Sequence, residues 1–143
     1  MAAAKTATGA LYQALMADPD VATDMGGTSD PRLHIDVAPQ DTVRPYGTLQ
    51  TIQDSSVHHQ GGVCALRDPL VQVDVWAETA EERDRLAEHF RARLDFLNGT
   101  QPDAHVRVVS LERVQNSAEP RNDGSGTYTF RWSADARVWY VPT

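Results

Sequence analysis

The most constraining feature of this sequence is a strand that runs directly into a helix, over residues 70–98. Val71, Val73 and Val75 alternate with polar residues, which is the period of a strand with one buried face. A helical pattern follows almost without a linker. We therefore expect the helix to pack back onto the sheet that contains this strand.

The helix of this segment has a clear start and a clear apolar face. Thr79 and Glu82 form an S/T-x-x-E capping box, which satisfies free N–H groups at a helix start. Its apolar stripe at helical spacing comprises Leu86, Phe90, Leu94 and Leu97. Asn98-Gly99 is the predicted stop. We predict packing on the sheet through Leu86, Phe90 and Leu94.

The N-terminal part predicts one more helix. Leu11, Ala14 and Leu15 fall at i, i+3 and i+4 within residues 6–18. Asp18-Pro19 is the predicted end, because a residue before proline avoids helical geometry.

Weaker patterns follow. Residues 23–31 are rich in Gly, Ser and Asp and predict a loop, and residues 33–37 alternate as a half-buried strand. Residues 46–57 are mostly Thr, Gln and Ser and predict an exposed or edge strand, followed by a loop over 58–69.

The C-terminal part predicts a hairpin. In the strand over 106–115 the apolar phase slips after Val108, so either both faces are covered or a bulge shifts the register. Residues 116–126 contain Pro, Asn, Asp and Gly and predict a long loop. Residues 128–140 alternate as a long strand with one aromatic-rich face.

These elements predict one domain over residues 1–143, a normal domain length. The fold class is α+β: a mainly antiparallel sheet of four to five strands with two α-helices packed on one face.

Charge and cysteine content exclude several classes of function. The formal net charge is −7 and the pI about 5.0, so the chain repels nucleic-acid phosphates rather than neutralising them. Cys64 is the single cysteine, so no internal disulfide is expected. The N-terminus lacks the apolar run of a signal peptide, and no stretch is apolar enough to span a membrane.

Neither a metal nor a cofactor is predicted. His58, His59 and Cys64 have the right residue types for a metal, with His34 or His105 as distant additions. Adjacent residues of an extended chain point in opposite directions, however, and a site needs three or four converging ligands. Solvated loop histidines are the simpler interpretation.

No catalytic nucleophile is predicted either. Nothing near Cys64 in the sequence lowers a thiol pKa, such as a helix start or a basic cluster. Ser125 lies in Asp-Gly-Ser-Gly, which lacks the G-x-S-x-G spacing and indicates a turn. Phosphate-binding glycine motifs are absent from the sequence.

The charged residues of the predicted helix are spaced as surface ion pairs rather than as a pair of catalytic carboxylates. Glu81 and Arg85 are spaced i, i+4, and Glu88 and Arg91 are spaced i, i+3. Solvated ion pairs explain them.

Tyr128, Phe130 and Trp132 have the spacing of a surface on which nucleic-acid bases stack. The segment lacks the pattern of interleaved basic residues that binds a nucleic-acid phosphate backbone. We therefore interpret them as core or interface residues.

The order of these motifs resembles the tail terminator family of long-tailed bacteriophages, also called tail completion or tail-to-head joining proteins. The resembling residues are Ala10, Leu11, Tyr12 and Leu15, the run 70–79 with Glu82, Leu86 and Ala87, and the closing Val138-Trp139-Tyr140. The resemblance extends from about Ala10 to Tyr140, and the long polar stretch 54–68 departs from the usual pattern.

The resemblance implies a fold like that of the lambda tail terminator and a hexameric ring at the head-proximal end of the tail tube. The implied partners are other copies of the chain, the major tail tube protein and a head completion or connector protein, in the virion and, during assembly, in the host cytoplasm. DNA passes through the lumen without specific binding, and the family offers no catalytic residues. The polar segments 40–68 and 116–126 are then expected to reach neighbouring subunits.

Two alternatives stay open from the residues alone. One is a head completion or connector ring of the phage neck. The other is a small-ligand-binding α+β domain, which requires a pocket with converging polar groups. The acidity fits either a DNA-repelling lumen or simple solubility.

Overall fold

A computed structural model describes residues 6–39, 42–54, 56–59, 62–102, 104–121 and 124–142, without the side chains of 56–59, 62–65 and 142. The described residues form three helices and eight strands. In chain order these are α1 (Ala7–Met16), α2 (Pro19–Asp24), β1 (Leu33–Ile35), β2 (Tyr46–Gln53), β3 (Ser56–His59), β4 (Gly62–Arg67), β5 (Leu70–Ala77), α3 (Ala80–Leu94), β6 (Gly99–Thr100), β7 (Ala104–Pro120) and β8 (Tyr128–Pro142).

The α+β class is confirmed, but the sheet is larger than predicted and mixed. Its strand order is β1-β2-β5-β8-β4-β3, with β7 on β8 and β6 on β7. The pair β1–β2 is parallel and the other pairs are antiparallel. The prediction of four to five strands was therefore wrong. The segment predicted as an edge strand, residues 46–57, contains β2, which lies between β1 and β5 with Leu49 fully buried.

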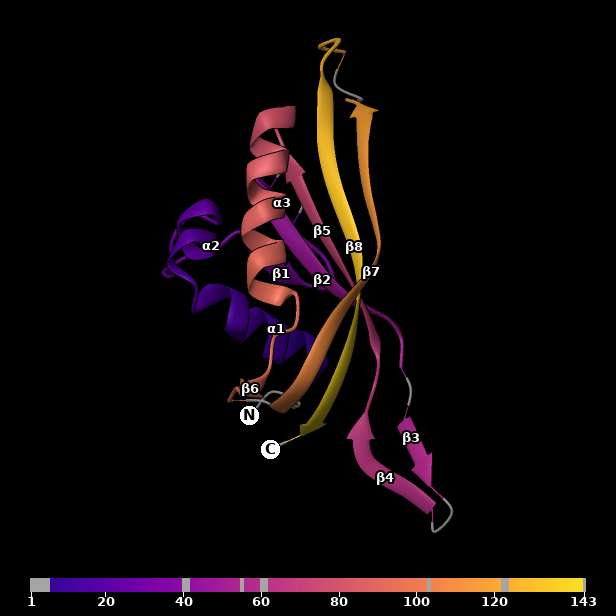
Figure 1. The fold of residues 1–143 in the computed structure, drawn as a ribbon. Coiled ribbons are helices and arrows are strands. Elements are labelled where there is room, and N and C mark those ends of the chain that lie inside the picture. The colour runs from indigo at the N-terminus through magenta and orange to yellow at the C-terminus, as the bar shows by residue number, and fades with distance from the viewer. Residues whose placement is uncertain are drawn as a thin grey trace.

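Two long ribbons organise the sheet. The ladder between β2 and β5 continues from the pair Gln53–Leu70 to Ser56–Arg67 in β3 and β4. This distal half, made of β3 and β4, extends beyond the sheet at one end of the molecule, and we call these two strands the β3–β4 arm (Figure 1). The second ribbon, β7–β8, turns at the opposite end (Figure 1). Loops had been predicted over 58–69 and 116–126, but strands continue into both.

The phase slip in β7 results from bulges. The register against β8 shifts between Val106 and Val108 and again between Glu112 and Val114. Val106 and Val109 both face the core as a result. Of the two interpretations left open by the sequence, the bulge is confirmed.

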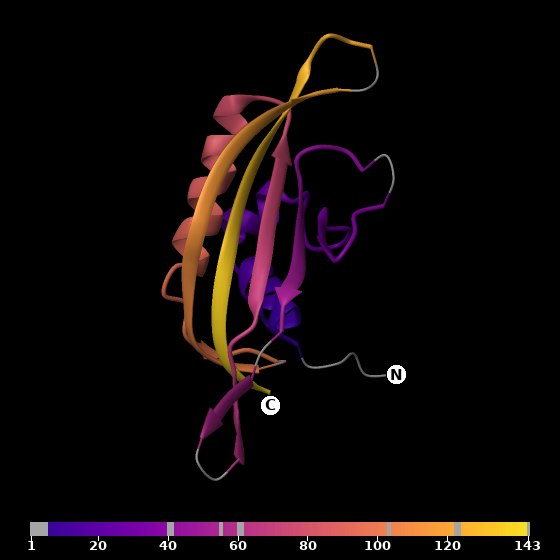
Figure 2. The same cartoon turned by 90° about the vertical axis from the view of Figure 1, so that its right-hand side faces the viewer.

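All three helices lie on one face of the sheet (Figure 2). The predicted apolar stripe of α3 is confirmed, because Leu86, Phe90 and Leu94 are fully buried. They pack with alternate residues of β5 and β8 in one core. Leu11 and Leu15 of α1 are buried in the same core, as predicted.

The short helix α2 was missed. Asp18-Pro19 had been interpreted only as a stop, yet Asp18 caps α2 by accepting hydrogen bonds from the N–H groups of Asp20 and Val21, at 3.0 and 3.3 Å. Proline suits the first position of a helix because the N–H it lacks has no partner there. The same dipeptide thus ends one helix and begins the next.

The helix α3 begins as predicted and ends early. Thr79 Oγ1 accepts from the Glu82 N–H at 3.1 Å, which confirms the cap. The helix ends at Leu94, before the predicted stop at Asn98. Phe96 then adopts a left-handed backbone with φ of 59°, and its N–H donates to the Val109 carbonyl of β7 at 2.9 Å.

Candidate interaction surfaces

The described residues contain no group of three or more side chains suited to hold a metal ion. The side chains of His58, His59 and Cys64 lie outside the described residues, so the predicted absence of a metal there stays a prediction. Of the distant candidates, His34 lies on β1, whereas His105 lies on β7 with its Nδ1 2.7 Å from the Thr100 hydroxyl.

Ser125 takes part in a turn. Its hydroxyl lies 2.6 Å from the Thr127 hydroxyl and accepts from the Thr127 N–H at 3.3 Å. These contacts fit the interpretation of Asp-Gly-Ser-Gly as turn chemistry.

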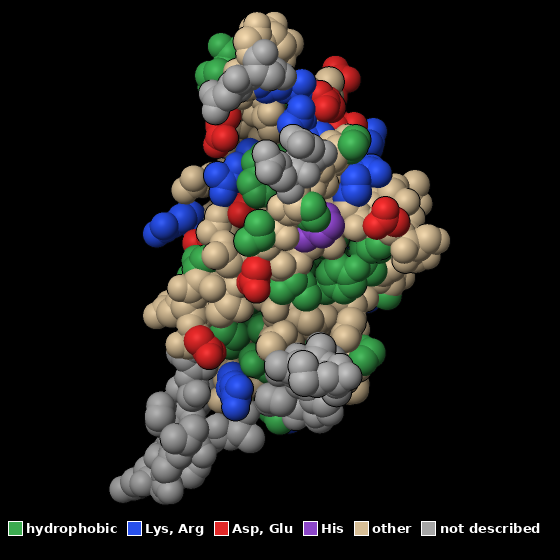
Figure 3. All heavy atoms as spheres, turned by 180° about the vertical axis from the view of Figure 1, so that it is seen from behind, with side chains coloured by type: hydrophobic (Ala, Val, Ile, Leu, Met, Phe, Trp, Pro, Cys, Tyr) green, Lys and Arg blue, Asp and Glu red, His purple; other side chains and the backbone are tan. Residues whose placement is uncertain are grey.

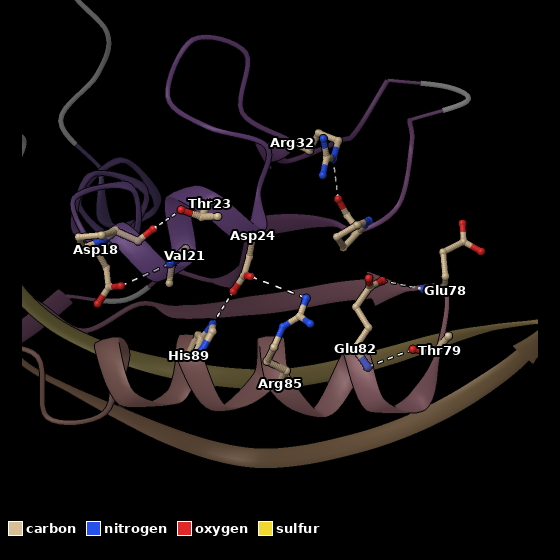
Figure 4. Close-up of polar contacts among 12 residues, drawn as sticks. Asp18, Val21, Thr23, Asp24, Arg32, Glu78, Thr79, Glu82, Arg85 and His89 are labelled. Atoms are coloured by element: carbon tan, nitrogen blue, oxygen red, sulfur yellow. Dashed lines mark hydrogen bonds and ion pairs between the residues drawn. The ribbon is translucent and has the colours of Figure 1, made fainter.

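The helix ion pairs predicted at Glu81–Arg85 and Glu88–Arg91 were wrong; among the described residues, Arg85 instead contacts Asp24 of α2 at 3.9 Å. The same carboxylate lies 2.5 Å from His89 Nδ1 (Figure 4). Local spacing suggested solvated pairs, but folding brings α2 against α3, and a nearly buried carboxylate attracts both side chains.

The aromatic residues of β8 divide between core and surface. Trp132 is almost fully buried and packs edge-to-face with Phe90, at 6.4 Å between ring centroids. Phe130 is half-buried under the Arg83 guanidinium, whereas Tyr128 is 50% exposed near the β7–β8 turn. No continuous platform for stacked bases results from the three rings.

The sheet face away from the helices carries a polar cluster centred on Asp74. Arg131 donates to its Oδ1 from Nε and Nη2, at 3.1 and 2.8 Å, and Gln72 donates to both carboxylate oxygens. The Arg131 guanidinium also lies over the Trp76 ring, which stacks on Tyr46. Burial raises the pKa of the Tyr46 hydroxyl. The cluster holds β2, β5 and β8 together on their open side.

Next to this cluster is a shallow depression of about 220 Å³. Its lining residues are Ile52, Gln72, Arg113, Gln115, Ser117, Arg131, Ser133 and Asp135. Small-molecule sites are usually lined by apolar side chains with a few polar groups. This lining is almost entirely polar, so the depression does not favour the small-ligand alternative.

Glu78, between β5 and α3, connects three segments. It receives hydrogen bonds from Arg44 at 3.2 Å and from Arg121, which follows β7. The hydrogen bond from Arg121 is the main cause that lowers the pKa of the Glu78 carboxyl, against the effect of burial. Sequence reasoning missed this junction because the three residues are far apart in the chain and follow no motif.

The edge of the sheet at β1 exposes apolar side chains. Ile35, Val37 and Val43 are 42%, 78% and 68% exposed; we call these three residues the β1-edge surface. Ile35 ends β1, and the loop that carries Val37 and Val43 is held at both ends. Asp36 donates its N–H to the Leu49 carbonyl at 2.8 Å, and Arg32 donates to the Pro45 carbonyl at 2.8 Å (Figure 4).

Figure 3 shows the molecule from behind, and hydrophobic side chains gather across the middle of this face. Among the described helices, none combines the length and the apolar character needed to cross a membrane.

Two of three comparisons with known proteins found a match, one to the sequence and one to the fold. Residues 9–141 match the sequence model of the family described as tail completion protein gp17. The fold is similar to a chain in the structure entitled "Virion of native gene transfer agent (GTA) particle", with a TM-score of 0.60 and 19% identity, over 93% of this chain and 94% of that chain. No curated protein matches the sequence.

Proposed function

Because this chain belongs to the tail completion protein gp17 family, whose members are structural proteins of phage virions, we propose that it forms a ring that ends tail-tube growth and joins the tail to the head. The family match over residues 9–141 carries the proposal, since it spans nearly the whole domain. The fold shared with a chain of a gene transfer agent virion supports it.

The shape of the subunit suits a ring between two different partners. The β3–β4 arm and the β7–β8 turn point away from the body in opposite directions (Figure 1). In a ring, one end of each subunit then meets the tail tube protein and the other meets a head completion or connector protein. The sides of the subunit remain for neighbouring copies, and the family resemblance implies six copies in the ring.

The role is structural and uses neither catalysis nor a cofactor. The ring stops tube growth because its outer face does not match the next tube subunit. A net charge of −7 suits a lumen through which DNA passes, because like charges repel. We expect weak self-association in solution and a stable ring on the tube end, since tube binding favours the assembled form by mass action.

The test is tube growth in the presence and absence of the purified chain. Tail tube protein is polymerised once with the chain and once without it, and the lengths and ends of the tubes are measured by electron microscopy. We expect capped tubes of limited length with a ring at one end. If tubes stop at the same length without the chain, the termination role is wrong. Rings that bind only to heads and never to tubes indicate a head completion protein instead.

A further inference from the structure

The strand β7 carries an arginine at each of its two bulges. In the register against β8, Arg107 and Arg113 are the residues that are skipped, so neither has a residue of β8 opposite it. A bulge inserts one extra residue, turns its side chain in a new direction and helps to keep an edge strand from pairing with another chain. The outer edge of β7 is therefore suited to present charged side chains to a partner. We call Arg107 and Arg113 the bulge arginines.

The bulge arginines are exposed, and neither forms an ion pair within the described part of the chain. The arginines of the neighbouring strand β8 differ, because Arg131 contacts Asp74 at 2.8 Å and Arg137 contacts Glu112 at 3.6 Å. Arg113 also has a φ of 36°, a left-handed backbone that is strained for this residue type. Strained residues persist where the surrounding fold holds them, and they are common at functional sites. Two unpaired cations on one strand are thus available to a partner.

The side of the body at β1 has the opposite charge. Residues 17–39 contain five aspartates and one arginine, so they hold four of the seven net negative charges of the chain. Asp30 and Asp36 lie on either side of β1, are exposed and have no ion-pair partner among the residues that the structure describes. Asp36 directly follows Ile35, and Asp30 lines the same surface hollow as Val43. The two unpaired carboxylates therefore border the apolar β1-edge surface.

The two charged surfaces lie at opposite sides of one subunit. In the strand order, β1 is followed by β2, β5 and β8, and β7 pairs with the far edge of β8. Figure 2 shows β7 along one side of the sheet and the loop between β1 and β2 beyond the other side. Unlike, complementary surfaces on one subunit join copies head-to-tail, and such contacts close into rings or continue as filaments.

We infer that the bulge arginines of one copy bind Asp30 and Asp36 of the next copy, in a head-to-tail contact that also covers the β1-edge surface. The ion pairs fix the orientation of the contact, because like charges meet when the same side of two copies comes together. The exposed Ile35, Val37 and Val43 add apolar area that the contact removes from water. This inference deepens the proposed ring by naming the two sides through which its copies meet, and it rests on that function only for the closure of the ring.

Charge complementarity favours a second copy as the partner of the bulge arginines. A nucleic acid is disfavoured, because the chain as a whole carries −7 and repels phosphates. Two copies also repel each other through their net charges, but charges farther apart than about 8 Å are largely screened at physiological ionic strength. Opposite charges in direct contact are screened much less. The uneven distribution of charge therefore makes the attraction local and specific to one orientation.

The first experiment reverses each surface separately. An edge variant combines Arg107→Glu with Arg113→Asp, and a side variant combines Asp30→Lys with Asp36→Asn. Aspartate and asparagine are chosen at positions 113 and 36 because both tolerate the left-handed backbone there. Each variant alone is expected to lower the association constant of the chain by about tenfold in sedimentation at low salt, because like charges then face each other. Circular dichroism and thermal melting check that both variants are folded.

The second experiment mixes the two variants in equal amounts. The lysine on the side variant then meets the acidic edge of the edge variant, and the unchanged surfaces of the two variants also match. The mixture is expected to regain the association of the wild type. Both variants keep a negative net charge, so attraction between whole molecules does not explain this result. The matched control combines Glu88→Lys with Asp95→Asn on the exposed side of α3, which changes the net charge as the side variant does. This control is expected to associate like the wild type.

Three results overturn the inference. They are an edge variant that associates as strongly as the wild type, a mixture that associates no better than either variant alone, and a control that loses as much association as the side variant. An edge variant that associates normally but no longer binds tube ends assigns the bulge arginines to the tube protein instead.

Tube capping separates this inference from the proposed function. If the edge variant alone still caps tubes with a ring, the contact is wrong and the termination role stands. If the mixture regains association and tubes grow on in its presence and in that of the wild type, the contact stands and the termination role is wrong.

Discussion

Replacing Phe90 by alanine tests the packing of α3 on the sheet. The ring is fully buried between Leu86 and Leu94, which are also fully buried, and it meets the Trp132 ring edge-to-face at 6.4 Å. Phe→Ala substitutions in cores cost about 3–5 kcal/mol. Loss of the aromatic pair is expected to put the cost near the middle of this range, at about 4 kcal/mol.

The assay is urea unfolding followed by tryptophan fluorescence and circular dichroism, with dilute protein that remains monomeric. In a domain of this size each kcal/mol lowers Tm by roughly 2–4 °C, so Phe90→Ala is expected to melt about 8–16 °C below wild type. Phe96→Ala is the matched control, because Phe96 lies just after the same helix and is 73% exposed. It is expected to change the free energy of unfolding by less than about 0.5 kcal/mol.

Equal stability of Phe90→Ala and wild type would refute the packing argument, since a ring in this position cannot be removed without loss of buried area. A double-mutant cycle with Trp132→Leu refines the test. The two substitutions should show a coupling of about 0.5–1.5 kcal/mol if the ring pair contributes beyond its area.

Four further predictions follow from individual residues. Phe96→Gly should be more stable than Phe96→Ala by about 1 kcal/mol in urea unfolding, because φ at this position is 59° and glycine adopts it without strain. Glu78→Gln should cost about 0.5 kcal/mol at pH 7. The folded pKa of Glu78 is lowered, so this difference is complete above the ordinary carboxyl pKa of about 4.5 and shrinks in unfolding curves as pH falls through the folded pKa. Asp74→Ala should cost about 3 kcal/mol by the same assay, because it leaves Arg131 without its main partner, and a cost below about 1 kcal/mol would indicate a solvent-screened pair. Elemental analysis should find no stoichiometric zinc, whereas one zinc per chain that is lost in His59→Ala would contradict the predicted absence of a metal site.

Patterns that act over a few residues were readable from the sequence. The alternation of Val71, Val73 and Val75 and the cap at Thr79 correctly located β5 and the start of α3, because both depend on neighbours within one turn or one strand repeat. Two of the signals that were missed are also local. Asp18 acts as a helix cap as well as a stop, and Phe96 ends α3 in a conformation usually taken by glycine or asparagine.

The pairing of strands was decided by the tertiary structure. The sequence predicted a strand over 33–37, but not its parallel pairing with β2, because either edge of a strand offers the same backbone groups. The continuity of β2 with β3, and of β4 with β5, likewise depends on register rather than on composition.

The candidate surfaces, too, were visible in the sequence only in part. The uncharged stretch 55–66 is visible in the sequence, but the projection of β3 and β4 from the body is a property of the fold. The contact of Asp24 with His89 and the junction of Glu78 with Arg44 join residues between 34 and 65 positions apart. The sequence by itself determined where β5 and the N-terminal helix lie, and where α3 begins and which face it buries, because these depend on near neighbours. Only the tertiary structure decided which segments meet, because such contacts depend on the whole chain closing around one core.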